Sequence, residues 1–148
     1  MATIRLGAAC VLSLCLSLCW ANLSPSGLNK LYNTRVQTAE HVTRLKQGMP
    51  SWVPKTYFTS HSGVRVTLDN GKQYLIHKGP GFGRASDTVV TDAAHMSNRW
   101  QVKKSQNMGG SRTVGDMVKA GGSRYSLIKG KHCHKAAKNM MRLGRRRN

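Results

Sequence analysis

Cysteine is scarce in this sequence, and the chain does not offer it in pairs where a domain could use them. Cys10, Cys15 and Cys19 lie near the N-terminus, and Cys133 is the only cysteine that follows them. Small secreted domains usually depend on paired cysteines, whereas a single cysteine can form no internal disulfide. The fold must therefore be held by a hydrophobic core, and Cys133 is left for an intermolecular disulfide or for chemistry.

Acidic residues are scarce as well. The chain has 24 lysines and arginines but only 5 aspartates and glutamates, which gives a formal net charge of +19. So cationic a surface attracts an anionic partner, and we expect an anionic lipid surface or the bacterial cell wall, with a glycosaminoglycan as a further candidate. Aromatic residues make up 6% of the chain and do not alternate with the lysines, so nucleic acid is not an expected partner. We expect a monomer with no cofactor and no metal.

Long apolar runs are absent except at the N-terminus. A short basic stretch, Met1–Arg5, is followed by an apolar run up to Cys19 and by Ala21, a small residue suited to cleavage. This order of segments is typical of a secretory signal peptide, and the run is shorter than the roughly 20 residues that span a bilayer. We therefore expect a secreted, extracellular protein. Its predicted parts are a signal peptide over 1–21, a single domain over 22–144 and a basic tail over 145–148.

The first part of the predicted domain has a helical pattern. Between Ser26 and Gln47, mostly apolar residues recur at steps of three and four, and Gly48 and Pro50 follow. That spacing predicts one helix over 26–47.

A hairpin is the clearest local prediction. Val64–Leu68 alternates apolar and polar residues as a half-buried strand does, a turn ends at Gly71, and Lys72–His77 forms a second strand. A two-residue turn and a three-residue loop with Gly71 in the left-handed conformation both fit this spacing. We favour the three-residue loop, because it collects the apolar residues of both strands on one face.

Two histidines share the opposite face in that register. Gly63 lies across from His77, and His61 lies one pleat further along the first strand. The two imidazoles are then close enough to share a neighbour.

The rest of the chain predicts short elements. Thr113 and Asp116 have the spacing of a capping box, so a short helix begins there and ends at Gly121-Gly122. The other expected elements are strands over 88–91 and 99–102, a polar loop over 103–112, a strand over 124–129 and a last helix over 133–143. This order predicts an α+β fold, a small antiparallel sheet with packed helices.

Cys133 is expected at the N-terminus of that last helix. The helix dipole and the free N–H groups of a first turn stabilise a thiolate. The surroundings of Cys133 are also basic, with Lys129, Lys131, His132, His134 and Lys135 as neighbours. Both effects lower the pKa of a cysteine and favour a nucleophile. A nucleophilic cysteine needs a base, and the histidines of the hairpin are the candidates.

Two parts of the chain resemble a known group of enzymes. Ser60–Gly71 and Tyr74–His77 resemble the histidine strand pair of the lecithin:retinol acyltransferase-like proteins, which belong with the NlpC-type permuted papain-like enzymes. Tyr125–Ala137 resembles their strand, turn and cysteine helix. The chain departs from that group beside the cysteine, where His132 replaces the usual asparagine and His134 the usual glutamate.

The resemblance implies a permuted papain-like domain with the nucleophile at the N-terminus of the last helix. By this resemblance, His61 is the base, His77 orients it, and Cys133 attacks an acyl carbonyl. We therefore expect a secreted cationic thiol acyltransferase or hydrolase that acts through a Cys133 thioester on an anionic substrate. The two-histidine arrangement favours phospholipid acyl groups over peptidoglycan.

Two other interpretations stay open. The chain could be a non-catalytic secreted protein that binds anionic targets, or acts as an antimicrobial, by charge alone, with Cys133 as a small buried residue. Alternatively, His132, Cys133 and His134 offer zinc-ligand chemistry together with the hairpin histidines, although consecutive residues in a helical turn point in different directions. A dependence of activity on Cys133 rather than on ionic strength separates catalysis from charge.

Overall fold

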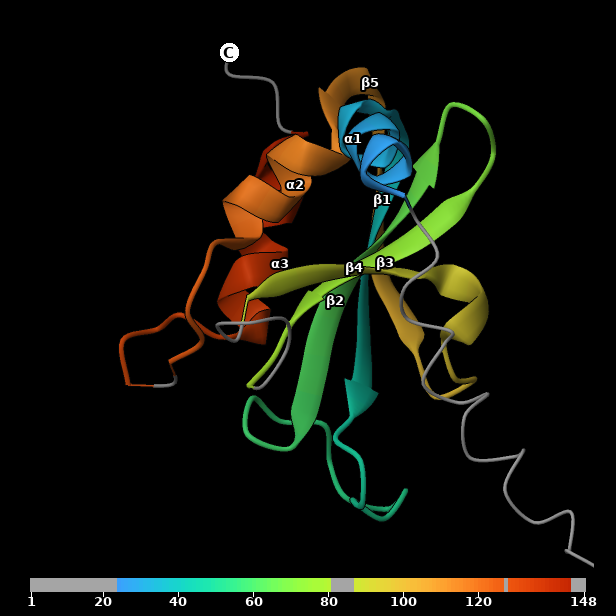
Figure 1. Cartoon of the computed structure of the whole chain (residues 1–148). Helices are drawn as coiled ribbons and strands as arrows, with labels where there is room; N and C mark the ends of the chain where they lie inside the picture. The colour runs from blue at the N-terminus through green and yellow to red at the C-terminus, as the bar shows by residue number, and fades with distance from the viewer. Residues whose placement is uncertain (1–23, 81–86, 127, 145–148) are drawn as a thin grey trace, which may run out of the picture. The chain divides into compact units, whose positions relative to one another are not determined.

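A computed structural model of the chain describes residues 24–80, 87–126 and 128–144 (Figure 1). The predicted signal peptide and the basic tail over 145–148 lie outside these ranges. The chain divides into two compact units, Met1–Leu31 and Tyr32–Asn148. The second unit contains the sheet and the candidate site, and α1 (Pro25–Asn33) begins in the first.

The described chain has an α+β fold, as predicted. It contains a five-stranded antiparallel sheet with strand order β4-β3-β2-β1-β5. The strands are β1 (Arg35–Leu45), β2 (Ser60–Leu68), β3 (Gln73–Lys78), β4 (Thr88–Asp92) and β5 (Gln101–Thr113). Besides α1 the helices are η2 (Ala93–His95), α2 (Val114–Gly121) and α3 (Cys133–Arg142). None of the described helices has the length and apolar character needed to cross a membrane.

The core lies between the sheet and the pair of helices α2 and α3. Helix α3 packs on β2, and α2 lies against α3 (Figure 1). The side chains that meet there are fully buried: Val64, Val66 and Ile76 from the sheet, and Met117, Ala137 and Met140 from the helices. This core, rather than a disulfide, holds α3 against the sheet.

The hairpin has the predicted register. Val64 pairs with Ile76 and Gly63 with His77, and Gly71 has a φ of 79°, in the left-handed region. The backbone N–H of Leu68 donates to the carbonyl of Lys72, which closes the three-residue loop. The capping box of α2 is also present, with Thr113 as the N-cap.

The predicted helix over 26–47 is wrong beyond its first turns. Helix α1 ends at Asn33, and Arg35–Leu45 forms β1, which pairs with β2 on one side and β5 on the other. The propensity of an isolated helix is weak, whereas a strand between two others satisfies the backbone groups along both of its edges.

A β-bulge explains the misleading spacing. The register of β1 shifts between Val36 and Thr38 against both neighbouring strands. The extra residue changes which face the following residues occupy, so Val36 and Ala39 are both buried although they are three residues apart. Val42 is buried on the other face of the same strand, where it pairs with Gly63. In a strand that has a bulge and is buried on both faces, buried residues therefore recur every three positions. The same spacing is typical of a helix.

Two further predictions are wrong. The expected polar loop over 103–112 is the middle of β5, a strand that pairs with β1 and is exposed along most of its length. Its lysines are typical of an edge strand. The expected strand over 124–129 does not form, since its described residues make only an isolated bridge between Ser126 and Lys131 around a turn in which Gly130 has a φ of 64°.

Candidate functional site

The two hairpin histidines form a hydrogen-bonded pair. The Nε2 atom of His61 lies 3.1 Å from the Nδ1 atom of His77. His61 is the second residue of β2, and His77 lies on β3 directly across from Gly63. A Cβ atom at Gly63 would lie 3.0 Å from the Cβ atom of His77, so the bare backbone of Gly63 gives His77 the room it occupies.

Burial keeps the second histidine of the pair neutral. Burial lowers the pKa of His77 to about 3, and the positive charges of His61 and Arg44 act in the same direction. Trp100 flanks the pair, with its ring centroid 5.7 Å from that of His61 and 6.4 Å from that of His77. The guanidinium of Arg44 lies 5.1 Å from the centre of the Trp100 ring. His77 is therefore suited to accept a hydrogen bond from a protonated His61.

Cys133 is the first residue of α3, as predicted, and it is buried, with an exposed fraction of 2%. His132 is the N-cap of this helix, and its Nδ1 atom accepts a hydrogen bond of 3.3 Å from the backbone N–H of Lys135. An imidazole that accepts this bond must be unprotonated at Nδ1. The thiol therefore sits at a capped helix N-terminus.

Hydrogen bonds from β2 and α3 favour the thiolate of Cys133. Burial alone raises the pKa of this thiol. The side chains of His134 and His61 and the backbone N–H of Ser62 form hydrogen bonds to the sulfur that lower the pKa more, to about 5. At neutral pH the sulfur is thus an anion held against two imidazoles.

His134 belongs to this site, although it was not among the predicted catalytic residues. Its Nε2 atom donates to the carbonyls of Tyr57 and Ser60, at 3.0 Å and 3.2 Å, so this nitrogen carries a hydrogen. Its Nδ1 atom lies 2.7 Å from the hydroxyl of Ser62. The hydrogen bond to Cys133 raises the pKa of His134 despite its burial. His134 is therefore placed to be the cationic partner of the thiolate.

The hydroxyl of Ser62 extends this contact to β1. It is fully buried and lies 3.4 Å from the Nε2 atom of His41. Burial lowers the pKa of His41, and the charges of His134 and Lys103 lower it further. A neutral His41 can form a hydrogen bond with the hydroxyl of Ser62 without adding a positive charge to the site.

Two tyrosines border the sulfur. Tyr57, from the connection between β1 and β2, stacks on His134 at a centroid distance of 4.9 Å and meets His132 edge-on at 4.6 Å. The pKa of Tyr125 is raised by burial first, and then by the charge of Cys133 and a hydrogen bond to it.

The structure brings together the three residues that the sequence proposed: His61 lowers the pKa of Cys133, and its Nε2 atom lies 3.1 Å from the Nδ1 atom of His77. It adds His134 and Ser62, for which the sequence signals were weak. Ser62 follows His61 in an alternating strand, so it was expected on the other face, and His134 was considered only as a basic neighbour and a possible zinc ligand.

No group of three histidine, cysteine or acidic side chains in the described ranges is arranged to hold a metal ion. Comparison with protein families, curated proteins and solved structures finds no match for this chain.

Proposed function

We propose that this protein is a thiol acyltransferase or hydrolase with Cys133 as nucleophile, His61 as base and His77 as the residue that orients the base. One observation carries the proposal. The only thiol outside the N-terminal segment lies at the N-terminus of a helix, His61 lowers its pKa, and the Nε2 atom of His61 is 3.1 Å from the Nδ1 atom of His77. That chain of nucleophile, base and orienting group is the arrangement that covalent catalysis requires.

The proposed reaction has two steps. The thiolate of Cys133 forms a bond to the acyl carbonyl carbon, and the imidazolium of His61 gives its proton to the departing oxygen or nitrogen, which leaves a thioester. Water or another acceptor then attacks the thioester, His61 takes its proton, and the thiolate departs. Because His77 is neutral, its Nδ1 atom accepts from the Nε2–H of His61 throughout.

The first turn of α3 offers stabilisation for the oxyanion. The N–H groups of a first helical turn have no partner within the helix, and the helix dipole adds positive potential there. One of them, that of Lys135, is bonded to the side chain of His132. The others near Cys133 are the candidates for the oxyanion hole.

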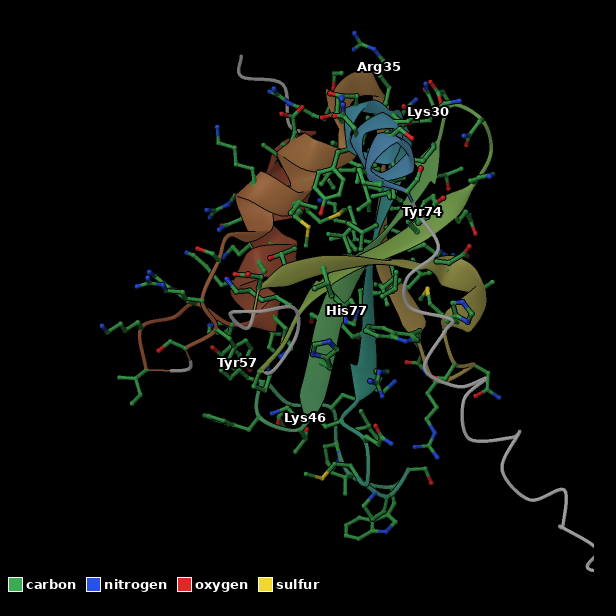
Figure 2. All side chains as sticks on the ribbon, in the orientation of Figure 1. Lys30, Arg35, Lys46, Tyr57, Tyr74 and His77 are labelled. Atoms are coloured by element: carbon green, nitrogen blue, oxygen red, sulfur yellow. The ribbon has the colours of Figure 1, made fainter. Side chains whose placement is uncertain are left out.

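Phospholipid acyl groups remain the favoured substrate, and exposed aromatic side chains support this choice. In the connection between β1 and β2, Trp52 and Phe58 are 81% and 74% exposed, and Tyr57, which contacts His132 and His134, is exposed too. Figure 2 labels Tyr57 and Lys46 at this end of the sheet. Aromatic rings beside lysines are typical of surfaces that enter the lipid interface.

The excess of positive charge supports an anionic substrate. The chain has 24 lysines and arginines against 5 aspartates and glutamates. Arg65 and Glu40 form an ion pair, at 2.6 Å. Among the described residues, Lys72, Lys104 and Lys138 are exposed, and an anionic surface that attracts such residues would hold the enzyme on its substrate.

The burial of Cys133 favours the second candidate, a non-catalytic protein that binds anionic targets by charge. A thiol with an exposed fraction of 2% can serve as a small core residue. Binding by charge alone falls steeply with salt and does not depend on Cys133.

The test is the pH dependence of Cys133 alkylation by iodoacetamide, followed by turnover of anionic liposomes. The wild type is expected to react with an apparent pKa of about 5 and to release fatty acid or transfer it. Cys133→Ala should bind the liposomes and release nothing. An inert thiol, or lipid turnover by Cys133→Ala, would refute the proposal. Turnover of peptidoglycan peptides instead of lipid would change the substrate and keep the mechanism.

A further inference from the structure

A lysine-lined cavity lies beside the candidate site. Its volume is about 360 Å³, and it is bordered by the end of β3, the end of α2, the turn around Gly130 and the first turns of α3. Four lysines line it, namely Lys78, Lys129, Lys131 and Lys135, and none of its described lining residues is acidic. Glycines and alanines contribute much of the remaining wall, so backbone is exposed to the cavity.

Lys78 is the buried member of this lysine group, with an exposed fraction of 2%. Its ammonium donates to the carbonyls of Gly121 and Ser123, at 3.2 Å and 3.0 Å. An ammonium group has three hydrogens, so these two bonds leave one donor for a ligand. Burial lowers the pKa of Lys78, as expected where a charge is only partly compensated by its surroundings.

The other charged groups near Lys78 do not neutralise the cavity. Asp87 raises the pKa of Lys78, whereas Lys131 lowers it. The carboxylate of Asp87 accepts a hydrogen bond from the backbone N–H of Arg124 and does not line the cavity. Lys129, Lys131 and Lys135 are exposed at its rim, so an anion entering from solvent meets three lysines before it reaches Lys78.

The cavity adjoins the candidate site at His132. His132 lines the cavity and precedes Cys133, whose thiolate charge raises the pKa of His132. Lys78 follows His77 on β3, although consecutive strand residues point to opposite faces. A ligand bound to the lysines would therefore lie beside the residue that precedes the thiol.

We propose that this cavity binds the phosphate group of a phosphate-bearing acyl substrate and so positions the ester at Cys133. The inference rests on the proposed function for the role of the ligand, but the binding of phosphate can be measured without it. A lipid headgroup and free phosphate offer the same group to the lysines, and the experiment below separates them.

Calorimetric titration with inorganic phosphate tests the site directly. The variant Lys129→Gln/Lys131→Gln/Lys135→Gln removes the rim and leaves the buried Lys78 in place, so the fold is retained. The control Lys72→Gln/Lys104→Gln/Lys138→Gln removes the same charge from exposed lysines that do not line the cavity. We expect the rim variant to bind phosphate at least roughly tenfold more weakly and the control to change by less than about twofold, because distant surface charges are screened.

The same three proteins are then mixed, in separate experiments, with vesicles of phosphatidic acid and with glycerol phosphate in solution without lipid. Binding to phosphatidic acid that the rim variant alone loses supports the cavity as a headgroup site. Binding of the soluble phosphate alone, again lost by the rim variant alone, supports a phosphate site that takes a soluble ester. Equal losses in both variants, or no binding of phosphate in either form by the wild type, would overturn the proposal.

Cys133→Ala distinguishes the failure of this inference from the failure of the proposed function. That variant should bind phosphate as the wild type does, because the side chain of Cys133 does not line the cavity. Phosphate binding without any acyl chemistry would leave the cavity assignment standing and reject the catalytic proposal. Acyl chemistry that is equally fast in the wild type and in the rim variant would support the catalytic proposal and reject the role of the cavity in positioning the substrate.

Discussion

The Nε2 atom of His61 lies 3.1 Å from the Nδ1 atom of His77, and the residue that pairs with His77 on the neighbouring strand is a glycine, Gly63. Gly63 has no Cβ atom, and one built there would approach Leu75 to 2.9 Å and His77 to 3.0 Å. The strand thus leaves His77 the space to turn its ring toward His61. The glycine contributes to the site although it carries no chemistry of its own.

Replacing Gly63 by alanine should therefore displace His77. We expect Gly63→Ala to lose turnover by roughly a hundredfold, because a misplacement of about 1 Å in a catalytic group can cost that much. Thermal unfolding measured beside kcat/KM separates this effect from loss of the fold. Thr67→Ala, on the same strand and far from the histidines, is the control and should leave turnover unchanged. Equal activities in the two variants would contradict this role of Gly63.

The two histidines that contact the sulfur should have separable effects. We expect both His134→Ala and His61→Ala to raise the pKa of Cys133, because each of these side chains lowers it. We expect His61→Ala to reduce turnover more, by roughly a hundred- to ten-thousand-fold, since it removes the base. Alkylation profiles and kcat, measured for both variants, test the division. If His134→Ala shows the greater loss of kcat, His134 is the base.

His77 should be replaceable by another neutral acceptor. The pKa of His77 is lowered to about 3, chiefly by burial, so this residue does not titrate in the range where the enzyme would work. His77→Gln retains a carbonyl acceptor, and we expect it to keep most of the activity and the same pH profile. His77→Ala should lose roughly tenfold to a hundredfold through misorientation of His61. A shifted acidic limb in His77→Gln would show that His77 itself titrates.

The stability of the protein should depend on pH through Cys133. Its folded-state pKa of about 5 lies below the ordinary value of 9.0, so the unfolded chain binds more protons between these values. The thiolate contribution is therefore lost as pH falls toward about 5 and grows as pH rises above it. The raised pKa of His134 acts in the opposite sense, since its contribution is present below 6.5 and is lost as pH rises through the raised value.

The difference in free energy of unfolding between the wild type and Cys133→Ser should thus increase from pH about 5, rise less steeply above 6.5 while the opposing contribution of His134 is being lost, and become constant above the ordinary thiol value of 9.0. Urea denaturation of both proteins over this range measures it. A difference that is constant with pH would mean that the folded-state thiol titrates as it does in the unfolded chain.

The exposed aromatic residues should matter for vesicles and not for soluble esters. We expect Trp52→Ser/Phe58→Ser to bind anionic vesicles more weakly while its turnover of a soluble thioester is retained. Leu28→Ser/Val102→Ser removes two other apolar side chains that are about half exposed and serves as the control. Equal vesicle binding by the two double variants would remove the aromatic argument for a lipid substrate.

The hairpin could be predicted to the exact register, because its information is local. Alternation from Val64 to Leu68 and the Asn-Gly turn determine which residues share a face, and that alone places His61 near His77. The start of α3 and the capping box of α2 follow from equally local signals. These elements contain all three of the proposed catalytic residues.

The remaining elements depend on contacts that are distant in sequence. The bulge in β1 produces the three-residue spacing of a helix, and only the pairing of β1 with two other strands shows it to be a strand. The residues of β5 are polar because it is an edge strand, and this polarity led to the prediction of a loop. The contact between His134 and Ser62 joins residues 72 positions apart, and no periodicity links them.

The same separation has a consequence for how the protein is made. The contact of His61 with His77 closes over 16 residues, whereas the contact of Ser62 with His134 closes over 72. Short-range contacts form sooner, so we expect the hairpin to be in place while the C-terminal part of the chain is still being synthesised. The thiol acquires its low pKa only when α3 docks on β2. A growing or truncated chain would then have the pair of His61 and His77 in place while the pKa of its cysteine is still ordinary. The cysteine would become reactive only at the last step of folding.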